Sequence, residues 1–201
     1  MNYTKGATVK FALKQSLPVL FGYLFLGSAF GIMLYKAGYN WLWAIFISLI
    51  VYAGSGQFLL VSLISAKADI ATTALMTLFI NTRHMFYGLS YIEKFKAGKW
   101  RYPFMIFTLT DETYSVNSSI LSVPENVDEP KARFLIGEFN HFYWIAGSAL
   151  GSLLSGAVGV FCAVICLIIF GADKFLLPSL LITVVILSSF KKFFETEEVA
   201  K

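Results

Sequence analysis

The stretch IATTALMTLFINTRHMFYGLSYI, residues 70–92, decides the fold because it is a long apolar run with polar side chains in its middle. Roughly 20 consecutive apolar residues make a helix long enough to cross the hydrocarbon layer of a membrane. We therefore predict a transmembrane helix that carries the guanidinium of Arg83 inside the membrane. A charge there costs at least ~2.5 kcal/mol, so such arginines usually face a cavity, a counter-charge or a substrate. Asn81, Arg83 and His84 are candidate site residues, although Arg83 could instead tie helices together through a carboxylate such as Asp111.

The composition extends this prediction to the whole chain. Of the 201 residues, 57% are hydrophobic and 14% are charged, and the mean hydropathy is +0.70, far from the averages of soluble domains. Backbone groups in lipid must be hydrogen-bonded within their own segment, and the apolar runs do not alternate, so we expect helices and not barrel strands. The predicted fold is an all-α, polytopic membrane protein with about six or seven apolar segments, some of them broken or re-entrant.

The charged residues and the cysteines exclude several kinds of partner. Basic residues lie in short loops between the apolar runs, so the net charge of +4 indicates membrane orientation and no nucleic acid partner. Cys162 and Cys166 have no second Cys or His pair near them in the sequence. We therefore predict that they are packing residues, and we expect no metal site and no cofactor.

Loop charges also bear on the topology of the run from Trp41 to Ser65. If this run enters the membrane and returns to the same side, ten Lys and Arg residues lie inside and five outside, which matches the positive-inside bias. A full crossing by every apolar run gives no such bias. We therefore expect a broken or re-entrant segment here. Residues 1–190 should form one transmembrane helical domain with a cytoplasmic N-terminus, and residues 191–201 a cytoplasmic tail.

The centre of the same run is polar for its depth in the membrane. It contains Tyr52, Gly54, Ser55, Gly56 and Gln57. A helix interrupted by glycine can free backbone groups to bind a solute, so these five are candidate site residues. The alternative is a tight helix crossing at the glycines, with Gln57 hydrogen-bonded to a neighbour.

Two further stretches contain glycines four residues apart, a spacing that lets helices approach closely. The first helix is predicted from Leu13 to Tyr35, beginning near Pro18, and it carries GSAFG at 27–31. A later helix carries GSALG at 147–151. Close packing is the expected role of the first pair, although the helix could instead break there to expose backbone groups.

A predicted span from Tyr102 to about Leu121 carries two adjacent carboxylates, Asp111 and Glu112, which project about 100° apart on a helix. Because both cannot face one partner, we expect Asp111 to pair with Arg83 or to receive a substrate amine. Glu112 is expected to be protonated or bonded to a hydroxyl. The two roles could be exchanged.

The C-terminal half offers further candidates for proton transfer. A helix predicted from Lys131 to Leu154 places Glu138 and His141 on one face, and with Glu112 they are candidates for proton coupling. A neutral His141 bonded to Glu138 as a structural contact is the alternative. Two short runs follow, Ala157 to Phe170 and Leu176 to Phe190, and each is shorter than an ordinary span.

Several runs resemble those of the AzlC family: VYAGSGQF at 51–58, NTRHMFYG at 81–88, TDETYS at 110–115, LPVLFGYLFLGSAFG at 17–31 and IIFGADKFLLP at 168–178. The resemblance implies a large subunit of a bacterial branched-chain amino acid exporter, multi-pass in the cytoplasmic membrane. It also implies a small membrane subunit, AzlD, as partner and leucine, isoleucine or valine as substrate. Family members are longer, and we expect that an apolar stretch between the GSALG helix and the IIFGAD region is absent here.

A zwitterionic amino acid needs an anion receptor, a cation receptor and an apolar pocket. Under the transporter hypothesis, Arg83 and opened amides at 54–57 hold the carboxylate, and Asp111 or Glu112 holds the ammonium. The branched side chain would lie among Tyr52, Phe86 and Tyr114.

Two alternatives stay open. An intramembrane serine hydrolase would use Ser55 as nucleophile, with His84 or His141 as base. It would leave Arg83 and the two carboxylates unexplained, so we predict that the chain is not an enzyme. The other alternative is a nontransporting structural or sensor subunit of the membrane.

Overall fold

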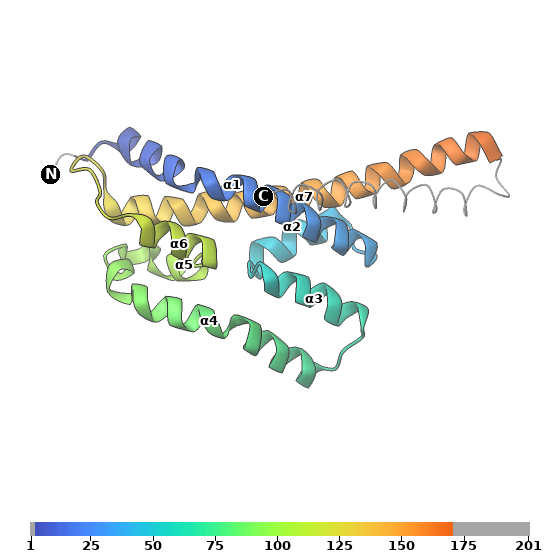
Figure 1. Ribbon diagram of the computed structural model, residues 1–201, viewed down its shortest axis with the longest axis horizontal. Helices are drawn as coiled ribbons and strands as arrows, with labels where there is room; N and C mark the ends of the chain where they lie inside the picture. The colour runs from blue at the N-terminus through green and yellow to red at the C-terminus, as the bar shows by residue number, and fades with distance from the viewer. Residues whose placement is uncertain (1–2, 171–201) are drawn as a thin grey trace, which may run out of the picture.

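The computed structural model describes residues 3–170, with side chains to residue 158, and this part of the chain forms helices and turns without a strand. Two long helices, α1 (Lys5–Lys36) and α7 (Glu129–Phe170), cross each other. A third, α4 (Ile70–Lys96), lies on the opposite side of the molecule, and shorter helices fill the space between (Figure 1). The prediction of an all-α fold is confirmed.

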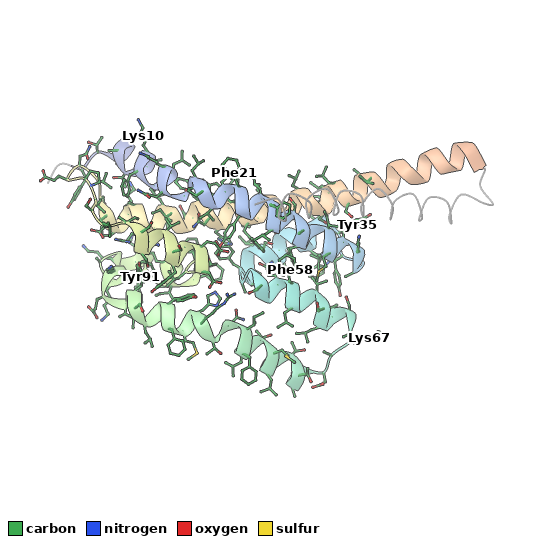
Figure 2. The ribbon with its side chains drawn as sticks, viewed as in Figure 1. Lys10, Phe21, Tyr35, Phe58, Lys67 and Tyr91 are labelled. Carbon is green, nitrogen blue, oxygen red and sulfur yellow. The ribbon has the colours of Figure 1, made fainter. Side chains whose placement is uncertain are left out.

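Within the described residues, α1 is the helix whose length and apolar composition suffice for a full membrane span. Two shorter apolar helices, α2 (Trp41–Ile50) and α3 (Ser55–Ser65), have 10 and 11 residues. Phe21 on α1 is 70% exposed and points away from the other helices (Figure 2). An apolar side chain in this position suits contact with lipid.

The start predicted for α1 is wrong, because the helix begins at Lys5 and Pro18 lies in its interior. The N-terminal extension is held by the loop that precedes α7. The Thr4 amide donates to the Asn126 carbonyl at 3.0 Å, and the Asp128 amide donates to the Thr8 hydroxyl at 3.1 Å. Tertiary contacts therefore stabilise turns that lie before the proline.

The crossing of α1 and α7 is formed by the two glycine motifs. A Cβ on Gly31 would lie 2.0 Å from the Ser148 carbonyl oxygen, and a Cβ on Gly151 would lie 2.0 Å from the Ser28 carbonyl oxygen. The Ser28 hydroxyl also donates to the Gly147 carbonyl at 3.2 Å. Close packing, the role expected for these glycines, is confirmed, and α1 does not break here.

The predicted break in the second apolar run is present between α2 and α3. Asn40 caps α2, since its side chain accepts from the Leu42 and Trp43 amides. The backbone leaves the helix at Val51, and both Tyr52 (φ 37°) and Gly54 (φ 49°) have positive φ. A positive φ is rare for a bulky residue such as tyrosine, so neighbouring structure must hold this conformation. Whether the two half-helices re-enter or cross the membrane stays a prediction.

A helix is present over residues 70–92 as predicted: it is α4, and it is uninterrupted. Among the described residues, however, α1 and not α4 has the length and apolar composition of a full membrane span. The start of α4 is set by Asp69, whose side chain accepts from the Thr72 amide at 2.9 Å and thereby satisfies one of the free donors of the first turn. Its basic end carries Lys94 and Lys96, which complement the helix dipole. Tyr91, labelled in Figure 2, lies near this end of α4. It anchors the end because its hydroxyl bonds the Ser118 hydroxyl at 2.9 Å.

The single span predicted from Tyr102 to Leu121 is wrong, because the chain breaks a second time. After a turn of 3-10 helix η1 (Lys99–Arg101), α5 (Tyr102–Phe107) ends at Thr108, and α6 (Asp111–Ser119) begins three residues later. Thr110 caps α6 through its hydroxyl, which accepts from the Thr113 amide at 3.3 Å. A capping threonine followed by two acidic residues is a helix start, and it lies inside an otherwise apolar run.

The separation of residues 131–154 and 157–170 into two segments is also wrong, because α7 continues from Glu129 to Phe170. Small residues from Gly151 to Gly159 do not end a helix by themselves when no proline or capping residue follows. The predictions for Cys162 and Cys166 concern side chains outside the described set. The run at 176–190 and the tail at 191–201 also lie outside the described residues.

Candidate functional site

Polar groups from the two broken helices and α4 meet at one pocket of about 240 Å³. The start of α3 contributes Gly54 and Ser55. The middle of α4 contributes Arg83 and His84, and the start of α6 contributes Thr110, Asp111 and Glu112. The volume lies below the roughly 300–1,000 Å³ of sites for drug-sized ligands, so it suits a single small metabolite.

Arg83 and Asp111 form an ion pair across α4 and α6 within this pocket. A second arm of the Arg83 guanidinium donates to the Ser55 hydroxyl, so this one side chain joins α3, α4 and α6. The side chains of Arg83 and Asp111 are 39% and 34% exposed. The predicted pairing of Arg83 with Asp111 is therefore present at the rim of a cavity.

Each member of the ion pair keeps one hydrogen-bonding atom unused. The Nε of Arg83 and the Oδ1 of Asp111 are buried, and neither has a hydrogen-bond partner among the described residues. A charged group with an unmade bond is costly in a place from which water is excluded. The pair thus offers one donor and one acceptor that only a ligand or a rearrangement would satisfy.

Glu112 has a different environment from its neighbour Asp111. Its Oε2 accepts from the hydroxyl of Tyr23 on α1 at 2.7 Å. The Tyr23 hydroxyl also bonds the Thr110 hydroxyl at 2.7 Å. The expectation that Glu112 would be bonded to a hydroxyl is confirmed.

The ends of two half-helices add to the electrostatics of the pocket. Residues at the N-termini of both α3 and α6 line it, and each helix N-terminus carries the equivalent of roughly +0.5 charge. These partial charges partly offset the excess of carboxylates, because the pocket is lined by two carboxylates, Asp111 and Glu112, and by the single guanidinium of Arg83. The amides of Gly56 and Gln57, however, donate to the Ala53 and Gly54 carbonyls at 2.8 and 2.9 Å, so these two amides are not open.

An apolar wall completes the pocket on the side of α1, α3 and α7. Its members are Leu26, Ala53, Phe58 and Trp144. The Trp144 indole donates to the Gln57 side chain at 2.7 Å, and Phe58 packs edge-on against Trp144. Gln57 is fully buried and fixes this wall from behind, which is the packing role considered as its alternative.

Several predicted site residues do not line this pocket: Tyr52, Gly56, Gln57, Asn81, Phe86 and Tyr114. Tyr114 stacks on Tyr87 of α4 at 4.4 Å, the Asn81 amide donates to the Thr77 carbonyl at 2.9 Å, and Phe86 is 64% exposed. The residues that sequence reasoning missed are Leu26, Ala53, Phe58, Thr110 and Trp144. Only Thr110 carries a local signal, as a capping threonine before two acids.

His141 and Glu138 do not form the predicted pair. Glu138 is exposed, whereas His141 is buried, and its Nε2 bonds the Ser48 carbonyl at 3.1 Å. The His141 ring also packs against Tyr52 at 4.3 Å and Phe107 at 5.5 Å. His141 therefore holds the C-terminal end of α2 beside α5, and Glu138 points elsewhere.

The hydrolase alternative finds little support in these contacts. Ser55 accepts from the guanidinium of Arg83, while His141 is engaged by the Ser48 carbonyl. No group of three or more His, Cys, Asp or Glu side chains in the described part of the chain could hold a metal ion. A larger depression of about 630 Å³ between α4 and α5 is almost entirely apolar, as expected of a surface that contacts lipid.

Discontinuous helices whose ends meet at a charged pocket are typical of membrane transport proteins. The chain belongs to the AzlC family, because the model of the AzlC protein family matches residues 18–158. No solved structure matches this chain.

Individual relatives agree with this assignment. The chain is 33% identical to an uncharacterized membrane protein of Helicobacter pylori, over 92% of this chain and 96% of the relative. It is 28% identical to the branched-chain amino acid transport protein AzlC of Bacillus subtilis, over 96% of this chain and 89% of the relative. It is also 28% identical to the inner membrane protein YgaZ of Escherichia coli, over 73% of this chain and 61% of the relative.

The match with the Helicobacter pylori relative extends over 220 positions, whereas 92% of the 201 residues of this chain take part in it. Roughly 35 of the matched positions therefore have no counterpart in this chain. That one internal segment is absent, and that it falls after the GSALG helix, stays a prediction.

Proposed function

We propose that this chain is a transporter subunit that exports branched-chain amino acids across the cytoplasmic membrane, together with a small AzlD-like membrane subunit. The carrying observation is the pair of unused atoms, Arg83 Nε and Asp111 Oδ1, at a small pocket with an apolar wall. An α-amino acid presents a carboxylate that accepts from a guanidinium and an ammonium that donates to a carboxylate. The Bacillus subtilis relative, a branched-chain amino acid transport protein, supports the substrate class.

The ion pair then acts as the closed form of the substrate receptor. When the solute enters, its carboxylate takes the fork of Arg83 as two parallel hydrogen bonds and its ammonium takes Asp111. The aliphatic side chain packs on Leu26, Phe58 and Trp144. Arg83 and Asp111 thus exchange their contact with each other for contacts with the carboxylate and the ammonium of the ligand. Because the ligand carries one negative and one positive charge, the net charge inside the membrane does not change.

Release of the amino acid on the other side of the membrane requires the ion pair between Arg83 and Asp111 to re-form. Arg83 binds groups on α3 and α6, the two half-helices that follow the breaks, so substrate binding loosens the contact that joins them. Half-helices moving about such breaks would expose the pocket alternately to the two sides. Glu112 is the proposed carrier of a coupling proton, because it lines the pocket and has no cationic partner among the described residues.

The test is efflux of labelled leucine from vesicles, with and without a co-expressed small subunit and an imposed pH gradient. Arg83→Lys keeps the charge and loses the planar fork, so efflux should fall by roughly 10- to 100-fold for a lost charged hydrogen bond of about 1.5–3 kcal/mol. Arg101→Lys, outside the pocket, is the matched control and should transport normally. Unimpaired leucine efflux by Arg83→Lys would contradict the proposed carboxylate receptor.

A further inference from the structure

The apolar depression between α4 and α5 is larger than the substrate pocket, and the proposed transport site does not use it. We call it the lateral groove. Its lining residues run along α4 from His84 to Ile92 and continue on α5 with Tyr102, Pro103 and Ile106. Its volume is about 630 Å³, against about 240 Å³ for the substrate pocket. The two cavities share one lining residue, His84.

Gly88 leaves the lateral groove open in the middle of its α4 wall. A Cβ on Gly88 would meet nothing within 4 Å, so no side chain of the described residues fills the space above it. Met85 and Leu89, which also line the groove, are 63% and 66% exposed. The other wall is short, because α5 has only 6 residues. The groove is therefore an open apolar channel and not a packed helix contact.

The length of the lateral groove is close to the depth of one membrane leaflet. The eight steps along the helix from His84 to Ile92 correspond to a rise of roughly 12 Å. The hydrocarbon of one leaflet is roughly 15 Å deep, half the thickness of the whole core. The acyl chain of a phospholipid can therefore lie along the groove, with its end near His84.

A basic loop crosses the other end of the lateral groove. Ile92 and Tyr102 both line the groove, and the loop 93–101 joins them, so this loop must lie at the groove's end (Figure 1). Its charged residues are Glu93, Lys94, Lys96, Lys99 and Arg101. Four cations against one carboxylate leave a surplus of three positive charges. The carboxylate is already engaged, since Glu93 pairs with Lys96 at 2.7 Å.

The other three cations of the loop have no carboxylate partner among the described residues. Lys94 lies over the Tyr91 ring at 5.3 Å, and Arg101 lies over the Trp100 ring at 5.1 Å, contacts that leave both charges uncompensated. Trp100 is 77% exposed, and exposed tryptophans are enriched at the level of the lipid headgroups. The loop thus offers positive charge where the headgroup of a lipid in the groove would lie.

We propose that the lateral groove binds one anionic phospholipid, with an acyl chain between α4 and α5 and the phosphate at the loop 93–101. Clusters of basic residues beside a membrane helix recognise anionic headgroups. A zwitterionic lipid has the same acyl chains but no net charge for the loop to bind. Because His84 lines both cavities, the end of the bound chain lies against a wall of the substrate pocket. The lipid site does not depend on which solute the pocket carries.

The experiment measures thermal unfolding of the full chain in detergent with increasing dioleoyl phosphatidylglycerol, dioleoyl phosphatidylcholine or glycerol phosphate. A ligand that binds only the folded state raises the unfolding temperature in a saturable way. We expect this rise with phosphatidylglycerol and not with the other two. Native mass spectrometry of the same samples should show one phosphatidylglycerol that stays bound after the detergent is removed.

Two pairs of variants test the two parts of the site. Gly88→Leu fills the groove and should abolish the effect of phosphatidylglycerol, whereas Gly22→Leu, at an equally open position on α1, should keep it. Replacing Lys94 and Lys99 together by glutamine should weaken phosphatidylglycerol binding by roughly 10- to 30-fold, the effect of two basic residues at an anionic headgroup. The same double replacement at Lys10 and Lys14, which are exposed on α1, is the matched control.

Three results would overturn the lipid proposal. The first is an equal rise of the unfolding temperature with phosphatidylcholine or with glycerol phosphate alone. The second is an equal loss of phosphatidylglycerol binding in the control variants. The third is a Gly88→Leu protein that still binds phosphatidylglycerol but no longer retains a co-expressed small subunit, which would assign the groove to a partner helix. Leucine efflux is measured separately, because lipid binding in detergent does not require transport.

Discussion

Gly31 on α1 lies directly against the backbone of Ser148 on α7, so close that a methyl group on Gly31 would come within 2.0 Å of the Ser148 carbonyl oxygen. The partner motif repeats the relationship in reverse, with Gly151 against Ser28. The similar sequences GSAFG and GSALG thus contact each other. In each motif a glycine leaves room for the backbone of a serine in the other motif. This crossing positions Tyr23 and Trp144, two residues that reach the candidate site from opposite helices.

Gly31→Ala should destabilise the protein, because backbone atoms on α7 cannot move aside as a flexible side chain could. Overpacking of this kind costs typically about 1–3 kcal/mol. Gly22→Ala is the matched control on the same helix, since nothing lies within 4 Å of its Cβ position. Thermal unfolding in detergent should show a lower midpoint for Gly31→Ala and an equal or higher midpoint for Gly22→Ala.

Gly54→Ala tests the first break. The φ of +49° at Gly54 is a conformation that other residues rarely adopt, although its Cβ position is unobstructed. The substitution should therefore cost roughly 1–3 kcal/mol through backbone strain alone. Gly88→Ala, in the unstrained interior of α4 with equally open space, should not destabilise. Equal unfolding midpoints for the two variants would show that Gly54 relaxes without cost.

Asp111→Asn should impair leucine transport, because the amide cannot balance the substrate ammonium or the Arg83 guanidinium. Breaking a partly buried charge pair leaves the other charge unpaired, so we expect a loss of at least roughly tenfold, or about 1.4 kcal/mol. Glu93→Gln removes a carboxylate from an exposed pair with Lys96 and serves as control. Wild-type efflux by Asp111→Asn would remove this carboxylate from the receptor.

Glu112→Gln should uncouple transport from the pH gradient, because a glutamine cannot take up a proton. Tyr23→Phe keeps the carboxylate but removes its 2.7 Å hydrogen bond, so coupling should persist with an altered pH profile. Glu138→Gln is the control, since Glu138 is exposed and does not line the pocket. The measurement is leucine efflux across a series of imposed pH gradients. If Glu138→Gln lost the coupling and Glu112→Gln kept it, Glu138 and not Glu112 would be the proton carrier.

Leu26→Ala should relax the choice of substrate, because it shortens the apolar wall of the pocket. The discrimination lost for each methylene is typically about 1–3 kcal/mol, so phenylalanine should compete with leucine more strongly by roughly tenfold. Leu17→Ala, also exposed on α1 but away from the pocket, is the control. Competition assays with unlabelled amino acids would give the ratio, and an unchanged ratio would place the side chain elsewhere.

The pairing of Arg83 with Asp111 could be predicted from the sequence because lone charges in an apolar run need partners, and few carboxylates lie inside the predicted spans. The sequence also predicts different partners for the carboxylates of Asp111 and Glu112, since the side chains of adjacent residues on a helix cannot both face one group. Thr110 and the acids after it carry the signal of a helix start, yet the surrounding apolar run favours one continuous span. At Thr110 the capping hydroxyl starts a new helix inside the apolar run. No such cap follows the small residues from Gly151 to Gly159, and the helix continues through them.

The sequence by itself determined the helical membrane class, the first break and the need for Arg83 to have a counter-charge. Each follows from a local property: apolar length, glycine conformation, or the cost of a charge in lipid. Only the tertiary structure decided that Leu26, Phe58 and Trp144 form the wall beside that charge pair, and that Gln57 and His141 support the fold from outside the pocket. The apolar side chains resemble every other membrane-facing residue in the sequence, and their role depends on the direction in which the crossing of α1 and α7 turns them.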